Sequence, residues 1–120
     1  MGTSVPIALE NDFWEALDHL VAVSSLAINR PKVSRHPRYP DIIYPVDYGY
    51  LEGTTTVDGG GLDVWAGTLP EKSLTSLVLT VDLLKRDVEI KLLLGCNAAE
   101  QEQILEFLNS DQMRAALILR

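Results

Sequence analysis

Apolar and polar side chains alternate most regularly in the second half of this chain, between residues 87 and 94. The two-residue period is that of a β-strand. It predicts that one set of side chains faces a core: Val88, Ile90, Leu92 and Leu94. The other set points the opposite way: Asp87, Glu89 and Lys91. A solvated outer face and the wall of a site both give this pattern, so it leaves the two alternatives open.

The pattern elsewhere predicts four more strands, at about residues 24–29, 42–51, 62–67 and 74–81. An amphipathic stretch predicts a helix over residues 13–22, capped by Asn11 or by Asp12 with Glu15 as its reciprocal partner. Asn97 and Glu100 form the same kind of capping pair before a helix at 98–109, and a last helix is expected from 110 or 111 to about 119. We therefore predict one domain over residues 1–120, of the α+β class and mainly β, with one N-terminal and two C-terminal helices.

The loop between the second and third predicted strands carries three consecutive glycines, at 59–61, with Asp58 and Asp63 on its rims. Glycine tolerates positive φ, so the chain can fold tightly and bring these two carboxylates together. Asp82 and Asp87 lie in the same way at the ends of two strands. Converging carboxylates repel one another unless a cation lies between them, and oxygen ligands suit Mg²⁺. We expect Mg²⁺ here, as a cofactor for a phosphorylated ligand.

The net charge of −7 argues against general binding of nucleic acids, which requires a basic surface. The positive charge nevertheless gathers in two segments, residues 30–38 and 85–91. Either these are solvated loops, or they hold an anion beside the metal. A single cysteine, Cys96, and the lack of a signal-peptide pattern or a long apolar run lead us to expect a cytoplasmic protein without a membrane segment. Cys96 itself is expected to be a buried apolar residue.

The predicted strand at 42–51 is rich in aromatic residues. Tyr44, Tyr48 and Tyr50 share parity, so their hydroxyls are expected on one face, although their rings would also suit a core. Gly49 allows another backbone to approach closely. The motifs of a P-loop, a serine-nucleophile elbow and a zinc site are absent from the sequence.

Several of these stretches together resemble a known family. Y-P-V-D-Y-G-Y-L, D-G-G-G-L-D-V and the later pair Asp82 and Asp87, with I-N-R-P-K-V-S-R-H-P-R-Y-P-D upstream, are similar to the soluble, magnesium-dependent inorganic pyrophosphatases. The similarity spans about residues 28–94 and implies a small five-stranded OB-like barrel with helices outside. It also implies pyrophosphate as the ligand and a homo-oligomer.

The resemblance assigns roles residue by residue. It implies catalytic roles for Asp58, Asp63, Asp87 and Tyr48, the tyrosine lying beside the attacking water. It implies magnesium ligation by Asp58, Asp63, Asp82 and Asp87. It implies phosphate binding by Tyr44, Arg38 and Lys91, and we expect Arg35 to bind phosphate with them.

The sequence also departs from the family pattern. Gly60 stands where the family has its central aspartate, the base for the attacking water, and Glu89 stands where the family has a lysine. Two functions therefore remain open. One is a magnesium-dependent hydrolase of pyrophosphate or a related phosphoanhydride, and the other is a non-catalytic module that binds phosphate, magnesium or a protein partner. A third alternative, binding of single-stranded nucleic acid, is disfavoured by the negative charge.

Overall fold

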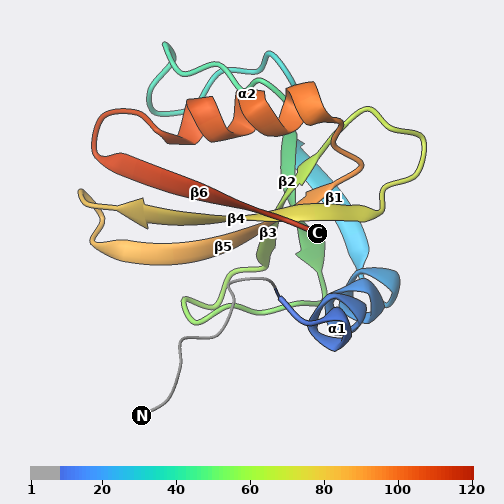
Figure 1. Cartoon of the computed structure of the whole chain (residues 1–120). Helices are drawn as coiled ribbons and strands as arrows, with labels where there is room; N and C mark the ends of the chain where they lie inside the picture. Colours follow the sequence, from blue (N-terminus) through green and yellow to red (C-terminus); the bar gives the residue numbers. More distant parts are fainter. Residues whose placement is uncertain (1–8) are drawn as a thin grey trace.

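One mixed sheet of six strands, with a helix on each face, makes up the fold of residues 9–120, the part of the chain that this computed structural model describes (Figure 1). In chain order the elements are α1 (Asn11–Ala22), β1 (Ser25–Arg30), β2 (Asp47–Glu52), β3 (Leu62–Ala66), β4 (Leu74–Asp82), β5 (Asp87–Leu94), α2 (Ala98–Leu108) and β6 (Met113–Leu119). The strand order is β1-β2-β3-β5-β4-β6. Neighbours are antiparallel except β3 and β5, which run parallel.

The two faces of the sheet carry separate hydrophobic clusters, as the alternation of side chains along the strands requires. On one face Trp14 of α1 packs against Leu77 and Leu92. On the other face Ile104 of α2 packs against Trp65 and Leu93. Figure 1 shows the two helices on opposite sides of the sheet. Because consecutive residues of β3, β4 and β5 enter different clusters, these central strands are buried on both sides and fix the frame of the molecule.

The pairing of β1 with β2 depends on Gly49. A Cβ atom at this position would lie 1.8 Å from the carbonyl oxygen of Ala27 in the neighbouring strand. The expected close approach of another backbone is thus confirmed, and the register of β1 shifts between Ile28 and Arg30 just beside it.

The two predicted helix caps have different outcomes. The capping box of α2 is confirmed, because the Asn97 side chain accepts from the Glu100 N–H at 2.8 Å and Glu100 accepts from the Asn97 N–H at 2.9 Å. The cap predicted for α1 is wrong. That helix begins at Asn11, two residues earlier than predicted; Glu10 is its N-cap residue, and no side chain caps it. Asp12 instead lies inside its first turn, where a negative charge favours the helix dipole.

The last predicted helix is wrong as well. Residues 113–119 form β6, which pairs with β4 from Ser76↔Leu119 to Asp82↔Met113. β6 is an edge strand of the sheet. The Asn109 side chain lies against it: its amide accepts from the Ala115 N–H at 2.9 Å and donates to the Ala115 carbonyl at 3.1 Å.

The closed five-stranded barrel is also not found. The sheet is open, with β1 and β6 at its two edges, because β6 takes the free side of β4 on which closure would depend. The inward facing predicted for β5 holds only for Leu92 and Leu94, which are buried. Val88 and Ile90 are 70% and 49% exposed, since α1 covers only the other end of that face.

Cys96 is buried, as expected, and its burial, with the nearby Glu100 carboxylate, raises the pKa of the thiol to about 12. Within residues 9–120, neither helix has the length and apolar character needed to cross a bilayer.

Candidate functional site

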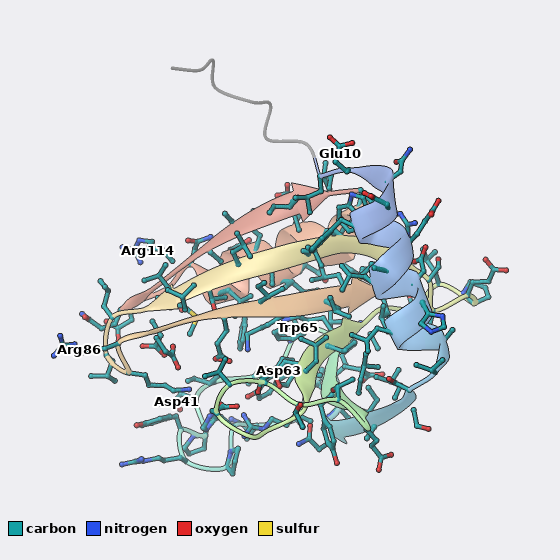
Figure 2. The ribbon with its side chains drawn as sticks, turned by 90° about the horizontal axis from the view of Figure 1, so that it is seen from below. Glu10, Asp41, Asp63, Trp65, Arg86 and Arg114 are labelled. Atoms are coloured by element: carbon teal, nitrogen blue, oxygen red, sulfur yellow. The ribbon has the colours of Figure 1, made fainter. Side chains whose placement is uncertain are left out.

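A large open groove of about 910 Å³ lies along residues 87–91 of β5. Its walls come from β5, the aromatic strand β2, the glycine-rich loop before β3, and the segment after β1. Figure 2 marks Asp63, which lies near the start of β3, and Arg86, which lies in the turn between β4 and β5. Asp87, Glu89 and Lys91 line the groove, and so do Val88 and Ile90 of the other set, so this end of β5 is the wall of a cavity and not only a solvated face.

Lys91 occupies the centre of the polar contacts in this groove. Only 6% of the residue is exposed. Its Nζ donates to the Tyr48 hydroxyl at 2.8 Å and to Asp63 Oδ2 at 2.9 Å, and lies 3.5 Å from Glu89 Oε1. The same atom lies 5.3 Å from the centre of the Tyr48 ring. The ammonium is therefore surrounded by oxygen acceptors and one aromatic face.

The ionisation states of this cluster follow from its burial. Burial favours the neutral lysine, but the oxygens of Tyr48 and Asp63 outweigh it and raise the pKa of Lys91. Burial, reinforced by the Asp63 charge, raises the pKa of Tyr48 as well, against the opposing effect of Lys91. At neutral pH the site thus holds a charged lysine and a protonated tyrosine. Tyr48 is placed to donate or accept a hydrogen bond, and not to act as a base.

Asp58 lies at the exposed tip of the glycine-rich loop. Its Oδ1 accepts from the Thr56 hydroxyl and from the Gly60 N–H, the latter at 3.1 Å. These two bonds, the hydroxyl first, lower the pKa of Asp58. Gly59 has a φ of +87°, which shows the tight turn expected of this loop. The loop brings Asp58 and Asp63 onto the lining of the same groove.

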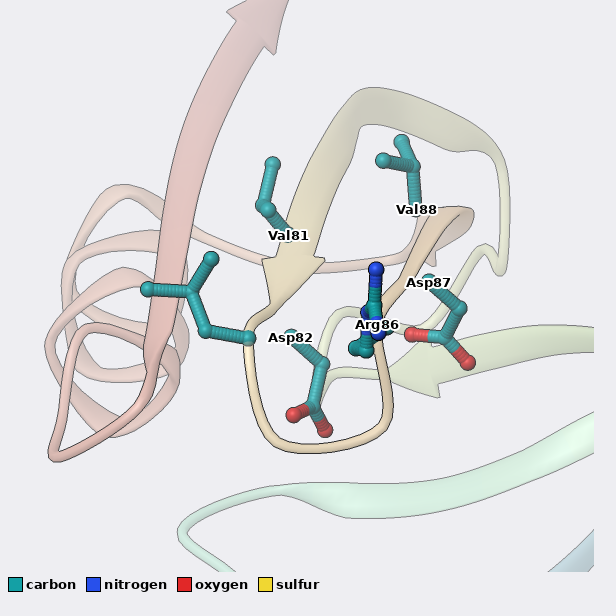
Figure 3. A pocket seen from close by; sticks show the side chains of 6 residues that line it. Val81, Asp82, Arg86, Asp87 and Val88 are labelled. Carbon is teal, nitrogen blue, oxygen red and sulfur yellow. The ribbon is translucent and has the colours of Figure 1, made fainter.

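Asp82 and Asp87 are paired residues at the end of the β4–β5 hairpin, and Figure 3 draws both with Arg86 of the turn that joins the two strands. Asp82 does not line the large groove, and its Oδ1 accepts the backbone N–H groups of Leu84 and Lys85, both at 3.0 Å. Its carboxylate therefore holds the turn. Asp87 does line the groove: its Oδ2 lies 3.7 Å from Lys85 Nζ, and its Oδ1 is buried without a hydrogen-bond partner.

Tyr44 is part of the core instead of the groove wall. It is buried and packs against Tyr48 and Trp65. Its hydroxyl accepts from Arg30 Nη1, and the guanidinium carbon lies 5.5 Å from the centre of the ring. Tyr44 thus positions Arg30, which lines the groove.

Two of the predicted phosphate ligands are not among the residues that line the groove. Arg35 donates to the Pro40 carbonyl at 2.9 Å, and Arg38 lies over the Tyr39 ring, both on the exposed loop after β1. Arg30 and His36 line the groove, although sequence reasoning assigned them no role there. The only signal for Arg30 was its place in the basic segment 30–38, which did not distinguish one arginine from another.

Two solved structures share this fold. An inorganic pyrophosphatase from Coxiella burnetii is similar with a TM-score of 0.54 and 14% sequence identity, over 77% of this chain and 81% of that one. A protein described as an inorganic phosphatase, from Anaplasma phagocytophilum, is similar with a TM-score of 0.53 and 12% identity, over 78% of this chain and 81% of that one. No protein-family model and no curated protein matches the sequence. At these identities the similarity shows the fold.

The carboxylates do not meet at one point. Within residues 9–120, no three acidic, histidine or cysteine side chains are close enough together to hold a metal ion. The donors nevertheless suit a hard cation: three carboxylates line one groove, those of Asp58, Asp63 and Asp87, and one oxygen of Asp87 is without a partner. The groove therefore carries the ligand types for Mg²⁺, with Lys91 now bonded to one of them.

Proposed function

We propose that this chain is a divergent pyrophosphatase-like hydrolase that cleaves pyrophosphate, or a related small phosphoanhydride, with Mg²⁺. One observation supports this most strongly. Five residues to which the sequence resemblance gave roles line a single groove, in a fold shared with a pyrophosphatase: Tyr48, Asp58, Asp63, Asp87 and Lys91. These residues come from three separate parts of the chain, so their positions in the sequence alone did not require them to line the same groove.

The charge of the groove explains why a metal would be needed. Three cationic side chains line it, those of Arg30, Lys85 and Lys91, and four anionic ones, those of Asp58, Asp63, Asp87 and Glu89, which leaves a net charge of −1. Pyrophosphate would be repelled by such a lining. Mg²⁺ bound by one or two of Asp58, Asp63 and Asp87, with waters and substrate oxygens completing its shell, would reverse the sign, neutralise phosphate charge and supply an acidified water.

The protein's own groups would bind and orient the substrate. Arg30 is held by Tyr44 with its guanidinium at the groove, where it would bind a phosphate oxygen. The Tyr48 hydroxyl, protonated at neutral pH, would orient a phosphate oxygen or the attacking water. Gly60 supplies no carboxylate to take the proton from that water, so the expected activity is weak.

Release of phosphate from pyrophosphate, measured with Mg²⁺ and with a chelator, tests the proposal. We expect release that needs the metal and falls at least tenfold in Asp58→Asn. Asp111→Asn is a matched control, because Asp111 is an exposed aspartate in the turn before β6 and does not line the groove. A background rate unchanged by Asp58→Asn would refute catalysis.

A non-catalytic binding module is the second candidate, and two observations favour it. Gly60 removes the base, and Lys91 is bonded to Asp63, one of the proposed metal ligands. Calorimetry distinguishes the two functions, because tight binding of magnesium pyrophosphate without phosphate release would identify a binding module. The homo-oligomer implied by the resemblance remains a prediction, which sedimentation velocity tests.

A further inference from the structure

We infer that Arg30 and His36 together form a binding site for one phosphate group, and that this site takes the group without a metal. Arg30 is the last residue of β1, His36 lies on the loop that follows, and both line the large groove. The inference deepens the proposed function and rests on it for the kind of anion, but it does not require catalysis. It gives His36 a ligand role and gives Arg30 a partner.

Arg30 carries a charge that no carboxylate balances. The ion pairs among residues 9–120 involve only Lys85, Lys91 and Arg120 as cations. The guanidinium of Arg30 is partly buried and donates to an uncharged group, the Tyr44 hydroxyl. A guanidinium has five N–H donors in a planar fork, so most of this fork remains for a ligand. A partly buried cation with an uncharged partner favours an anion beside it.

The hydrogen bonds of His36 determine which of its ring nitrogens is a donor. Its Nδ1 accepts from the backbone N–H groups of Arg38 and Tyr39, at 3.0 and 3.2 Å. Burial most, and then the charges of Arg30 and Arg38, lowers the pKa of the imidazole, so the ring is neutral at neutral pH. A neutral imidazole has one N–H donor. Because Nδ1 is the acceptor, that donor is Nε2–H.

Both side chains are arranged around Tyr44. The guanidinium carbon of Arg30 lies 5.5 Å from the centre of the Tyr44 ring. The His36 ring lies nearly parallel to the same ring, at an angle of 10° and with 6.4 Å between the ring centres. Tyr44 is itself buried against Trp65, and the His36 backbone N–H donates to the Ile42 carbonyl at 2.9 Å. The two donors are therefore held in place before a ligand arrives, which lowers the entropy cost of binding.

Strand pairing puts this site beside Tyr48. Arg30 and Tyr48 are partners in the register of β1 and β2, and the rings of Tyr44 and Tyr48 stack with centres 5.7 Å apart. Lys91 bonds to both the Tyr48 hydroxyl and Asp63, so it shields this end of the groove from the Asp63 carboxylate. One phosphate group would therefore bind here in spite of the net charge of −1 over the whole groove.

The test measures binding of inorganic phosphate by calorimetry in the presence of a chelator. We expect wild type to bind with a Kd of about 1 mM, as two charge-assisted hydrogen bonds would give. Arg30→Gln and His36→Asn should each bind at least about tenfold more weakly, the factor of one such bond. Arg114→Gln is the matched control for the lost charge, because Arg114 is exposed and does not line the groove.

The choice of asparagine at residue 36 separates ligand binding from a structural role. Its Oδ1 can still accept the N–H groups of Arg38 and Tyr39, so the loop keeps its bonds and only the Nε2–H donor is lost. Equal phosphate affinities of wild type and His36→Asn would overturn the inference. So would a loss of binding in Arg38→Gln, the arginine that the sequence resemblance favoured, with Arg30→Gln unchanged.

A measurement on wild type keeps the test decisive if Arg30→Gln does not fold. The side-chain N–H signals of Arg30 and His36 are followed by NMR during a phosphate titration with the chelator present. We expect both signals to shift with the same midpoint. Unchanged signals at saturating phosphate would overturn the inference.

The outcomes separate this inference from the proposed function. Metal-free phosphate binding that depends on Arg30 and His36, with no release of phosphate from magnesium pyrophosphate, supports the inference and overturns the hydrolase. Magnesium-dependent release by a wild type that binds no phosphate without the metal overturns the inference and still supports the hydrolase.

Discussion

Replacing Gly60 with aspartate should restore the missing base. The site has room for the change: a Cβ atom at Gly60 would lie 3.4 Å from Asp58 Oδ1 and 3.9 Å from the Thr56 hydroxyl oxygen, which are ordinary contacts. Gly60 also lines the groove and, unlike Gly59, does not have a positive φ. The new carboxylate would therefore enter the groove without strain in the backbone.

The size of the gain follows from what a base contributes. General-base catalysis typically gives about 10²–10⁴-fold, which is roughly 2.7–5.5 kcal/mol of activation free energy. The nearby Asp58 carboxylate disfavours a second negative charge, so the pKa of the new carboxyl should rise, which makes it a stronger base. Because the supporting phosphate ligands are fewer than the resemblance implies, we expect the lower end, about a 10²-fold increase in kcat.

The assay is phosphate release from pyrophosphate with saturating Mg²⁺. Gly60→Asn is the matched control, because asparagine has nearly the same size and cannot accept the proton. Gly59→Asp is a second control, since it places the same charge one residue away on a backbone with a φ of +87°. A Gly60→Asp variant no faster than Gly60→Asn, with unchanged circular dichroism and melting temperature, would show that the missing base does not limit the reaction.

Four other predictions follow from the geometry. Gly49→Ala should destabilise the fold by about 1–3 kcal/mol or more in urea unfolding, because its Cβ would collide with the backbone of Ala27. Glu100→Gln should cost roughly 1.5–3 kcal/mol of unfolding free energy. Burial raises the pKa of Glu100, but the backbone N–H groups that it accepts prevail and lower it. The difference in unfolding free energy between wild type and Glu100→Gln should be largest above pH 4.5 and should shrink as the pH falls through the lowered pKa of Glu100. An equal difference at every pH would contradict this prediction. Asp82→Asn should leave phosphate release unchanged, since asparagine can still accept the N–H groups of the turn, whereas lost activity would support the metal role implied by the resemblance. In an NMR pH series, His36 should titrate below 6.5. Burial lowers its pKa most, and the charges of its arginine neighbours lower it further.

Local sequence predicted the positions of the central strands well, although the alternation of β5 agreed with burial only at Leu92 and Leu94. It failed at β6, where a short apolar run, A-A-L-I-L, suits a helix and a strand equally. The choice was made by pairing with β4 more than thirty residues away, and that pairing also keeps the sheet open. Neither could be read from the segment itself.

The sequence named several residues that lie together in the fold, but it did not predict the contacts between them. The resemblance named Tyr48, Asp63 and Lys91, and all three lie in one groove. Their hydrogen bonds join residues 28 and 43 positions apart, so the neutralisation of Asp63 by Lys91 depended on how the strands are arranged. Asp82 shows the converse: its place in the motif fitted a metal ligand, but the hairpin uses its carboxylate to hold a turn.

The amide of Asn109 has a consequence for how this molecule meets its neighbours in solution. By satisfying both main-chain groups of Ala115, it does at that point what a seventh strand would do. After Ala115, only the last few residues of β6 can still pair with a strand of a second chain, and they are fewer than the roughly five or six residues of an ordinary strand. A single small side chain thus shortens the part of this edge that is open to pairing, and the exposed charge of Arg114 near the start of β6 acts in the same direction.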